Sequence, residues 1–338
     1  MNKRIFAADA LLLITAAVWG FGFVAQRSGM LYVGPFAYNG IRFPLASLSL
    51  LPIIAWRRRG RLKAEEKKTF IISSFLAGTC LFFGVTIQQL GMMFTTAGNA
   101  GFITGLYVVF TPIFGIFLGR KTGKATWVGA ILTLTGLYFI STTGRLDSIN
   151  PGDIVIAFSA VFWAFHVLII DRLVQKTDPI ILSSGQFAFV GFYALIAAFL
   201  IEPWLSRRLL TLSPELLSYG LCTWKSFPTL LNDLASGSVP GSLISSALIP
   251  ILYGGLASVG IGYTLQVVAQ KDAPPAHTTI ILSLEGSFAV LGGILILHEP
   301  LGARTLTGFA FMLTGMLISQ WEQITGSNTL PAESGKKT

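Results

Sequence analysis

The sequence predicts an all-α integral membrane protein, with ten transmembrane helices arranged as two inverted repeats of five helices. The first observation is composition: 53% of the 338 residues are hydrophobic, only 12% are charged, and the mean hydropathy is +0.69. Soluble domains carry about 25% charged residues, so this chain could not cover a soluble surface. The other two observations are the length of the apolar runs and a set of residues that recur at constant spacing.

Ten apolar runs follow one another along the chain, and each is close to the 20 residues or so that span a bilayer core as a helix. In chain order they cover approximately 8–26, 35–56, 69–92, 96–119, 125–142, 153–171, 179–202, 243–270, 274–297 and 303–321. We therefore expect ten membrane-spanning helices joined mostly by short loops.

Residues of the first half recur in the second half at two constant spacings. At a spacing of 144 the pairs are Trp19 and Trp163, Pro35 and Pro179, and Phe43 and Phe187. At a spacing of 178 they are Gly84 and Gly262, Thr86 and Thr264, Gln88 and Gln266, and Asn99 and His277. Five spans is an odd number, so the second copy enters the membrane from the opposite side and the repeats are inverted. Inverted repeats are a common construction of secondary transporters.

The spacing defines the domains. The first repeat covers 8–142 and the second 153–321, and the change in spacing from 144 to 178 places an insertion of 34 residues within about 203–241, on the outer side. Ser213 and Pro214 resemble a helix start there, and we expect a short outer helix. Two interpretations of the insertion stay open, a tolerated loop expansion and a functional lid. The polar residues 322–338 are expected to form a disordered cytoplasmic tail.

The net charge of +9 is explained by membrane topology rather than by a nucleic-acid partner. If the N-terminus is cytoplasmic, 17 of the 24 Lys and Arg residues fall on the cytoplasmic side and six fall outside. This bias follows the positive-inside rule. We expect both termini to be cytoplasmic and the lipid bilayer to be the main partner.

Ionisable residues inside spans are costly in hydrocarbon and usually face a cavity or the bundle interior. Glu285 and His277 lie in the same span, about 12 Å apart along the helix and about 80° apart around it, so both could face one cavity. Glu285 could exchange a proton, bind a cationic substrate group or be a hydrogen-bonded structural element. Arg42 lies in the second span; we expect its side chain to snorkel outward, and the alternative is that it attracts an anionic group.

The candidate substrate-binding residues share a position deep within their spans or a counterpart in the other repeat. Trp19 and Trp163 lie about ten residues into their spans, too deep for an interfacial belt, and core packing is the alternative role. The polar candidates could contact a ligand or form interhelical hydrogen bonds. The full set is Trp19, Gln88, Asn99, Tyr107, Trp163, His166, Gln266, His277 and Glu285.

The sequence has no pattern typical of an enzyme. It contains no phosphate-binding loop, no pair of carboxylates beside a nucleophile and no His/Cys cluster. We therefore expect no catalytic residue, cofactor or metal site, and no ATP hydrolysis by this chain.

Several short segments, in this order, resemble the EamA family of the drug/metabolite transporter superfamily. They are Ala17-Val18-Trp19-Gly20, Arg42-Phe43, Thr96-Ala97-Gly98-Asn99-Ala100, Ser283-Leu284-Glu285 and His298-Glu299-Pro300-Leu301. The family often has Pro after Ser-Leu-Glu, where this chain has Gly286. The resemblance extends over about 8–321 and implies a ten-helix carrier in the inner membrane of a prokaryote. Glu299 precedes Pro300 at a helix start, where capping accounts for it.

These observations favour a secondary transporter that exports a small metabolite, an amino acid or a similar polar or amphipathic compound, by alternating access and with proton exchange. Two alternatives stay open. One is uptake of a vitamin or sugar by the same fold, and the other is a non-transporting membrane receptor or scaffold. The sequence does not distinguish a monomer from a homo-oligomer.

Overall fold

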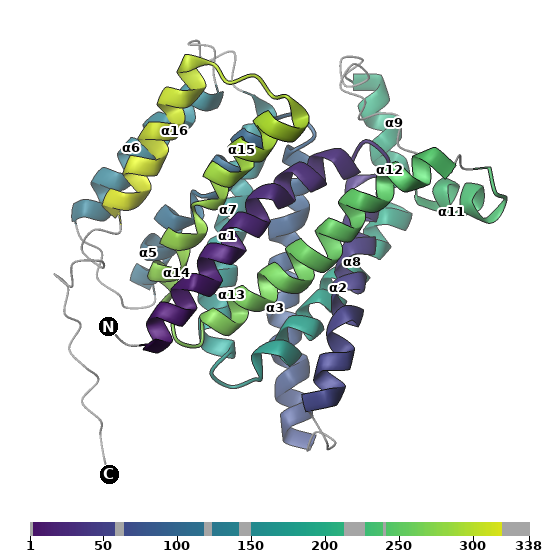
Figure 1. The fold of residues 1–338 in the computed structure, drawn as a ribbon, viewed down its shortest axis with the longest axis horizontal. Coiled ribbons are helices and arrows are strands. Elements are labelled where there is room, and N and C mark those ends of the chain that lie inside the picture. The colour runs from purple at the N-terminus through teal and green to yellow at the C-terminus, as the bar shows by residue number, and fades with distance from the viewer. Residues whose placement is uncertain are drawn as a thin grey trace.

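The computed structural model describes residues 3–57, 64–117, 124–141, 150–212, 227–238 and 241–319, and the regular elements in these ranges are helices without a β-strand. The first half contains α1 (Lys3–Gly29), α2 (Pro35–Arg57), α3 (Ala64–Gly91), α4 (Ala97–Thr104), α5 (Tyr107–Phe117) and α6 (Lys124–Ser141). The second contains α7 (Pro151–Leu173), α8 (Pro179–Leu200), α9 (Glu202–Leu212), α11 (Phe227–Ala235), α12 (Gly241–Leu252), the π-helix η2 (Tyr253–Tyr263), α13 (Thr264–Ala269), α14 (Pro275–Leu282), α15 (Glu285–Leu297) and α16 (Ala303–Ser319). Figure 1 shows their arrangement as a helical bundle.

The bundle is built to lie in a membrane. Within the described residues, seven helical segments are long and apolar enough to cross a bilayer, and Trp127–Ile140 and Ala303–Ile318 are shorter apolar helices. Large apolar side chains face outward, including Trp56, Phe117 and Leu200, which are 80%, 84% and 74% exposed. Such surfaces are stable against lipid and would be costly in water.

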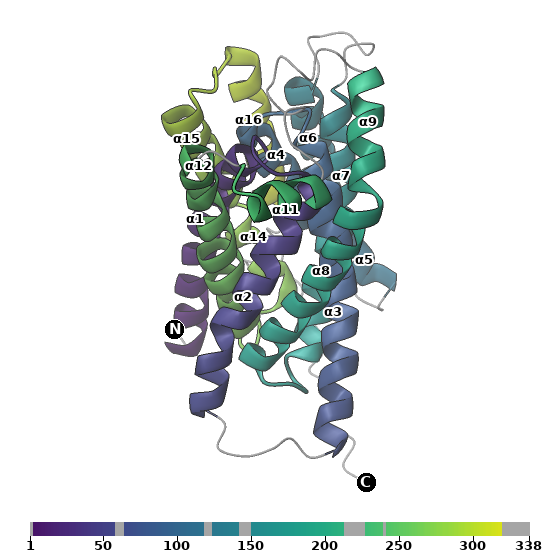
Figure 2. The ribbon, with the colours of Figure 1, turned by 90° about the vertical axis from the view of Figure 1, so that its right-hand side faces the viewer.

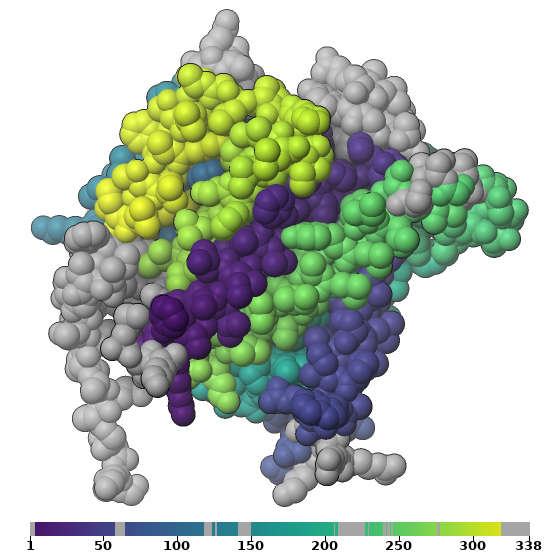
Figure 3. Space-filling view, in the orientation of Figure 1, coloured from purple at the N-terminus to yellow at the C-terminus, as the bar shows by residue number. Residues whose placement is uncertain are grey.

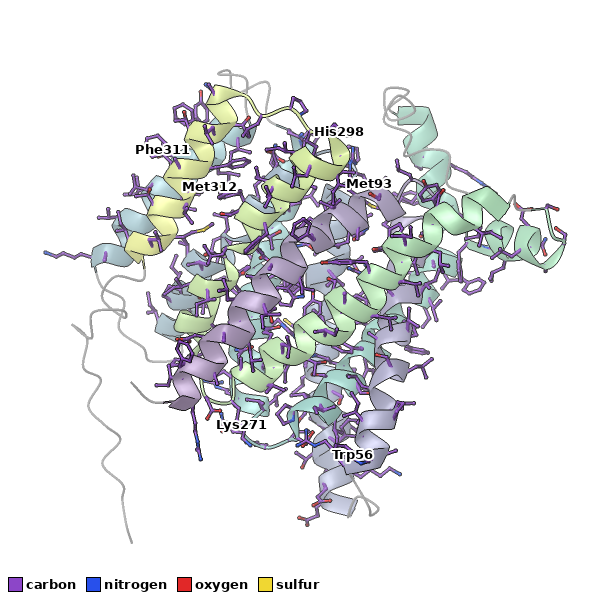
Figure 4. The ribbon with its side chains drawn as sticks, in the orientation of Figure 1. Trp56, Met93, Lys271, His298, Phe311 and Met312 are labelled. Atoms are coloured by element: carbon purple, nitrogen blue, oxygen red, sulfur yellow. The ribbon has the colours of Figure 1, made fainter. Side chains whose placement is uncertain are left out.

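The two ends of the bundle can be followed in Figure 4. Trp56, at the end of α2, and Lys271, after α13, lie at one end, whereas Met93 and His298 lie at the other. The start of α1 lies at the same end as Trp56, and α9 and α11 lie at the opposite end (Figure 1). Lys271, one of the basic residues expected to be cytoplasmic, therefore lies at the end where α1 begins.

Helices from the two halves of the chain pack against one another. The main pairs are α2 with α8, α6 with α16, α3 with α7 and α8, and α1 with α15 and η2. Figure 3 shows α1 in purple lying diagonally between the segments of α14 and α15 on one side and those of α12 and η2 on the other. The bundle is thus held together by contacts between distant parts of the sequence.

The α6–α16 pair depends on two glycines. A Cβ on Gly136 would lie 2.5 Å from the carbonyl oxygen of Gly308, and one on Gly308 would lie 2.8 Å from that of Gly136. Membrane helices use such small residues to bring their backbones close, because lipid supplies no hydrophobic force between them.

Two helical segments are interrupted at positions related by the 178-residue spacing. One passes from α4 to α5 at Tyr107, and the other passes from α14 to α15 at Glu285. Both interruptions place a polar side chain at the first residue of the new helix. These breaks therefore bring Tyr107 and Glu285 to the middle of the bundle.

Two carboxylates cap helices far away in sequence. Glu299 accepts hydrogen bonds from the amides of Ala97 at 2.7 Å and Gly98 at 3.2 Å, at the start of α4. Capping was expected for Glu299, but the capped helix is α4 rather than the following helix α16. Glu202 accepts bonds from the amides of Phe36 and Ala37 at 3.0 and 2.9 Å, at the start of α2. Both carboxylates also complement the positive end of a helix dipole.

Glu202 links the insertion to the bundle. Helix α9 begins at Glu202, and α11 lies across the N-terminal end of α2 in Figure 2. Phe227, the first residue of α11, packs against Phe199 of α8 with ring centroids 5.1 Å apart. One short outer helix was expected within 203–241, and the structure describes two short helices in this region, α9 and α11. The helix start expected at Ser213 and Pro214 and the tail 322–338 lie outside the described residues.

Glu202 gives the first testable prediction. Burial raises the pKa of its carboxyl from 4.5 to about 7, and the amides of Ala37, Phe36 and Phe227 act in the opposite direction. Because the folded protein holds this proton more tightly than the unfolded chain, the stabilisation is present below pH 4.5 and is lost as the pH rises through about 7. The melting temperature in detergent should therefore fall between about pH 5 and about pH 8, and Glu202→Gln should flatten this fall.

The matched variant Glu202→Ala removes both capping bonds and should lower stability at every pH, by about 0.5–2 kcal/mol. An unchanged pH dependence in Glu202→Gln would show that another group titrates in this range.

Candidate substrate-binding cavity

A small cavity, with a volume of about 20 Å³, lies in the centre of the bundle. Its lining residues come from both halves of the chain, and they are Trp19, Phe23, Gln26, Arg42, Gln88, Thr104, Tyr107, Trp163, Ser258, Tyr263 and Glu285. Ligand pockets for small molecules typically measure about 300–1,000 Å³, so in this conformation the cavity has room for a water molecule rather than for a solute.

Aromatic rings form one wall of the cavity. Trp19 and Tyr263 have ring centroids 4.4 Å apart, and Trp163 stacks on Tyr263 at 5.9 Å with an interplanar angle of 11°. The indole Nε1 of Trp19 donates a hydrogen bond to the carbonyl oxygen of Ser258 at 3.0 Å. Such a wall offers an apolar surface and can also attract a cation through the ring faces.

Glycine makes room for each tryptophan. A Cβ on Gly262 would lie 2.6 Å from Nε1 of Trp19, whereas a Cβ on Gly84 would lie 3.4 Å from the nearest atom of Trp163. The two glycines and the two tryptophans are counterparts in the sequence repeat. Each tryptophan thus packs against a glycine of the opposite half, more tightly at Trp19.

Polar groups form the opposite part of the lining. The hydroxyl of Tyr107 donates to Oε1 of Glu285 at 3.0 Å, and Nε2 of Gln88 donates to Oγ1 of Thr104 at 2.9 Å. Glu285 is only 3% exposed, and its carboxyl accepts its hydrogen bond from this neutral hydroxyl. A buried carboxylate with so few partners is a typical feature of a transport site.

Arg42 differs from our expectation. Its side chain does not snorkel outward; it is 1% exposed and lines the cavity. Nε donates to Oδ1 of Asn39 at 2.9 Å and Nη2 donates to Oε1 of Gln26 at 3.1 Å. The guanidinium also lies 5.1 Å from the ring centroids of Tyr38 and Phe43. These contacts hold a cation inside the bundle, which the position of Arg42 early in its span did not predict.

The π-helix η2 carries two lining residues, Ser258 and Tyr263. π-Helical turns are rare and occur frequently at functional sites, because they shift the register of the side chains that follow. Three glycines of η2, Gly254, Gly255 and Gly260, lie against α2 side chains or backbone. The sequence is rich in glycine here, but it contains no signal that distinguishes a π-helix from an α-helix.

The cavity unites five of the nine candidate residues: Trp19, Gln88, Tyr107, Trp163 and Glu285. The others are not among its lining residues. Nε2 of His166 lies 2.9 Å from Oε1 of Gln186, Nε2 of Gln266 donates to Oε1 of Gln270 at 2.9 Å, and Nδ2 of Asn99 donates to Oγ1 of Thr95 at 3.3 Å. The His277 side chain lies outside the described residues.

Six lining residues were not among the candidates, and they are Phe23, Gln26, Arg42, Thr104, Ser258 and Tyr263. Gln26 lies seven residues after Trp19, on the same helical face, and Tyr263 lies between the recurring Gly262 and Thr264. On these sequence positions, Gln26 and Tyr263 could have been added to the candidate substrate-binding residues. Within the described part of the chain, no group of three or more His, Cys, Asp or Glu side chains could hold a metal ion.

The chain belongs to the EamA-like transporter family of the drug/metabolite transporter superfamily. The family matches this sequence twice, over residues 6–142 and 150–320. Together with the helices that can cross a bilayer, this defines a multi-pass membrane protein whose general activity is transport across the membrane.

Known relatives agree with this assignment. An uncharacterized transporter of Archaeoglobus fulgidus is 26% identical over 317 residues, which cover 94% of this chain and 86% of the relative. Solute carrier family 35 member F6 of Mus musculus is 24% identical over 57% of this chain and 58% of its own. A solved crystal structure matches 94% of this chain and 99% of its own with a TM-score of 0.60; its 15% identity shows a common fold alone.

The glycines beside the tryptophans give a matched pair of variants. Gly262→Ala should destabilise the protein by about 1–3 kcal/mol, since its Cβ would overlap the Trp19 indole. Gly84→Ala should change stability by less than about 0.5 kcal/mol, because its Cβ would only make an ordinary contact with Trp163. Thermal unfolding of both variants in detergent measures the difference. Equal effects would contradict the tighter packing at Trp19.

Proposed function

We propose that this protein is a secondary carrier that moves a small metabolite through the central cavity by alternating access between two inverted repeats. The observation that carries the proposal is that counterpart residues of the two halves meet each other beside the cavity. Trp19 and Trp163 have ring centroids 6.3 Å apart, Phe43 and Phe187 6.1 Å apart, and Tyr107 donates a hydrogen bond to Glu285. Counterpart residues can touch one another only near the axis that relates the repeats.

The helix pairs support the same axis. Helices α2 and α8, the second spans of the two proposed repeats, pack together, and so do α6 and α16, the fifth spans. The family match to two segments of similar extent also supports a duplication. On this interpretation α2 and the two shorter apolar helices complete a set of ten spans with the seven longer ones.

The two tryptophans differ in their hydrogen bonding, and this asymmetry supports alternating access. Nε1 of Trp19 donates to the carbonyl of Ser258, while the buried Nε1 of Trp163 has no hydrogen-bond partner among the described residues. The counterpart of Ser258, 178 residues earlier, is Cys80. In the alternative state the two repeats exchange their conformations. Nε1 of Trp163 then donates to the carbonyl oxygen of Cys80, and the bond from Trp19 to Ser258 is broken. The two states then resemble each other with the repeats interchanged.

Export from the cytoplasm across the inner membrane, with both termini cytoplasmic, is the direction we propose. The distribution of basic residues supports the topology, because 17 of 24 belong to the expected cytoplasmic side. Glu285 supports proton exchange, because it is the buried carboxylate that lines the cavity. Uptake by the same fold is the alternative direction. A receptor or scaffold would not need buried polar groups around an internal cavity.

The test is solute flux into proteoliposomes that hold the purified protein, with pooled amino acids and other metabolites and with or without a pH gradient. We expect protein-dependent flux that requires the gradient, and we expect Glu285→Gln to abolish the dependence on the gradient, since an amide cannot exchange a proton. Glu65→Gln, an exposed change at the start of α3, is the matched control and should behave like the unchanged protein.

If the flux is the same with and without the gradient, and the same in Glu285→Gln, the protein is a carrier without proton exchange. No flux from folded protein across a broad pool would contradict the proposed function.

A further inference from the structure

A second pocket, larger than the central cavity, lies between α5 and α7. Its volume is about 330 Å³, which is within the range of ligand pockets for small molecules. Its lining residues are Phe114, Phe117, Phe165, Leu168, Ile169 and Arg172. None of these residues lines the central cavity, so the two sites are separate.

One face of each helix forms the pocket. The four lining residues of α7 occupy positions i, i+3, i+4 and i+7, which lie on a single helical face, and the two of α5 are three residues apart. The rings of Phe114 and Phe165 stack with centroids 4.5 Å apart and an interplanar angle of 4°, and they join the two helices. The walls are therefore apolar, and Arg172 is the charged residue among them.

The rim of the pocket faces the outside of the bundle. Phe117 is 84% exposed and Phe165 is 42% exposed, and Figure 2 shows α5 at the edge of the bundle. In a bilayer this surface is surrounded by hydrocarbon. An empty hollow deprives the atoms that line it of van der Waals partners, so a hollow open to lipid is filled by an acyl chain.

Arg172 lies where α7 reaches the end of the bundle that is expected to be cytoplasmic. Helix α7 ends at Leu173, and Nε2 of Gln175 donates to the carbonyl oxygen of Lys271 at 3.3 Å. Figure 4 places Lys271 at this end. Arg172 is seven residues after Phe165, about 10 Å further along the helix, and its side chain is exposed. The charge therefore lies at the level of the headgroups, beyond the apolar walls.

The surroundings of Arg172 favour an anion. Among the described residues its guanidinium has no hydrogen bond or ion pair. Asp171 lies about 100° around the helix and is not a lining residue, and Asp178 accepts hydrogen bonds from two amides at the start of α8 at 3.0 and 3.2 Å. Lys176, in the turn after α7, is exposed and adds a second positive charge nearby.

We infer that the pocket between α5 and α7 binds one anionic phospholipid of the cytoplasmic leaflet, with an acyl chain between the two helices and the phosphate group on Arg172. A guanidinium matches two phosphate oxygens with parallel N–H donors. Basic pockets between membrane helices on the cytoplasmic side bind anionic headgroups in this way. The lipid would contact both halves of the chain, because α5 belongs to the first half and α7 to the second.

The test measures lipid binding to the full-length protein in detergent by native mass spectrometry. The probes are phosphatidylglycerol and phosphatidylcholine with the same palmitoyl and oleoyl chains. We expect one phosphatidylglycerol to bind at least about fivefold more tightly than phosphatidylcholine, the factor that one arginine near an anionic headgroup contributes. Glycerol 1-phosphate carries the charged group without chains and should compete at least about tenfold less well than phosphatidylglycerol, because it leaves the apolar walls uncovered.

Charge variants test the position of the headgroup. Arg172→Gln should remove the preference for phosphatidylglycerol, and Arg172→Lys should keep part of it, because an ammonium retains the charge but lacks the guanidinium fork. Arg57→Gln is the matched control. Arg57 is an exposed arginine at the end of α2, at the same end of the bundle and outside the pocket, so its variant should keep the preference.

A filled pocket tests the position of the acyl chain. Ile169→Trp places an indole in the hollow and should weaken the binding of both lipids. Ile154→Trp is the control, because Ile154 is also on α7, is 58% exposed and lies outside the pocket. If a variant does not fold, the comparison of the two lipids on the unchanged protein decides the question.

Equal binding of the two lipids would overturn the inference, and so would equal losses of preference in Arg172→Gln and Arg57→Gln. Competition by glycerol 1-phosphate as strong as by the whole lipid would show that no chain occupies the pocket. A dimer that Ile169→Trp converts to a monomer, without a lipid preference, would assign this face to a second copy of the chain. The assay does not depend on transport, so its result is separate from that of the flux experiment.

Discussion

A hydrocarbon environment supplies no hydrogen-bond partners, and the rest of this structure follows from that constraint. Polar groups inside the bundle have to be satisfied by the protein or by what enters its cavity. Several find partners on neighbouring helices, as Gln88 does with Thr104 and His166 does with Gln186. Arg42 and Glu285 have only neutral partners in the described hydrogen bonds, and both line the central cavity. Two ionisable side chains with only neutral partners thus line one cavity.

Close packing allows the site to be built from both halves of the chain. Glycines permit the approach, since Gly262 gives the Trp19 indole its place and Gly136 and Gly308 bring α6 and α16 into backbone contact. The aromatic wall joins Trp19 of α1, Trp163 of α7 and Tyr263 of η2 in one cluster. A change in the relative position of the halves must therefore alter the shape and the polarity of the cavity at once.

Much of the fold was readable from the sequence. Apolar run length predicted the helical membrane bundle, because each span has to bury its own backbone polar groups within one segment. Recurrence of residues such as Trp19 and Trp163 directed attention to positions that meet in the structure. Part of the candidate site was found in the same way, since Gln88, Tyr107 and Glu285 are polar residues deep in their spans. His166 and Gln266 fit the same description, yet their hydrogen bonds are to Gln186 and Gln270.

The sequence by itself determined the class of protein, the approximate spans and the distribution of charge, because these depend on local hydropathy and on counting basic residues. Only the tertiary structure decided which polar side chains share a cavity. The orientation of Arg42 depends on Asn39, Gln26 and aromatic rings around it, and the caps at α2 and α4 come from Glu202 and Glu299. Those carboxylates lie 165 and 202 residues away from the amides that they bind. Such contacts depend on how the helices rotate and pack, which no local pattern records.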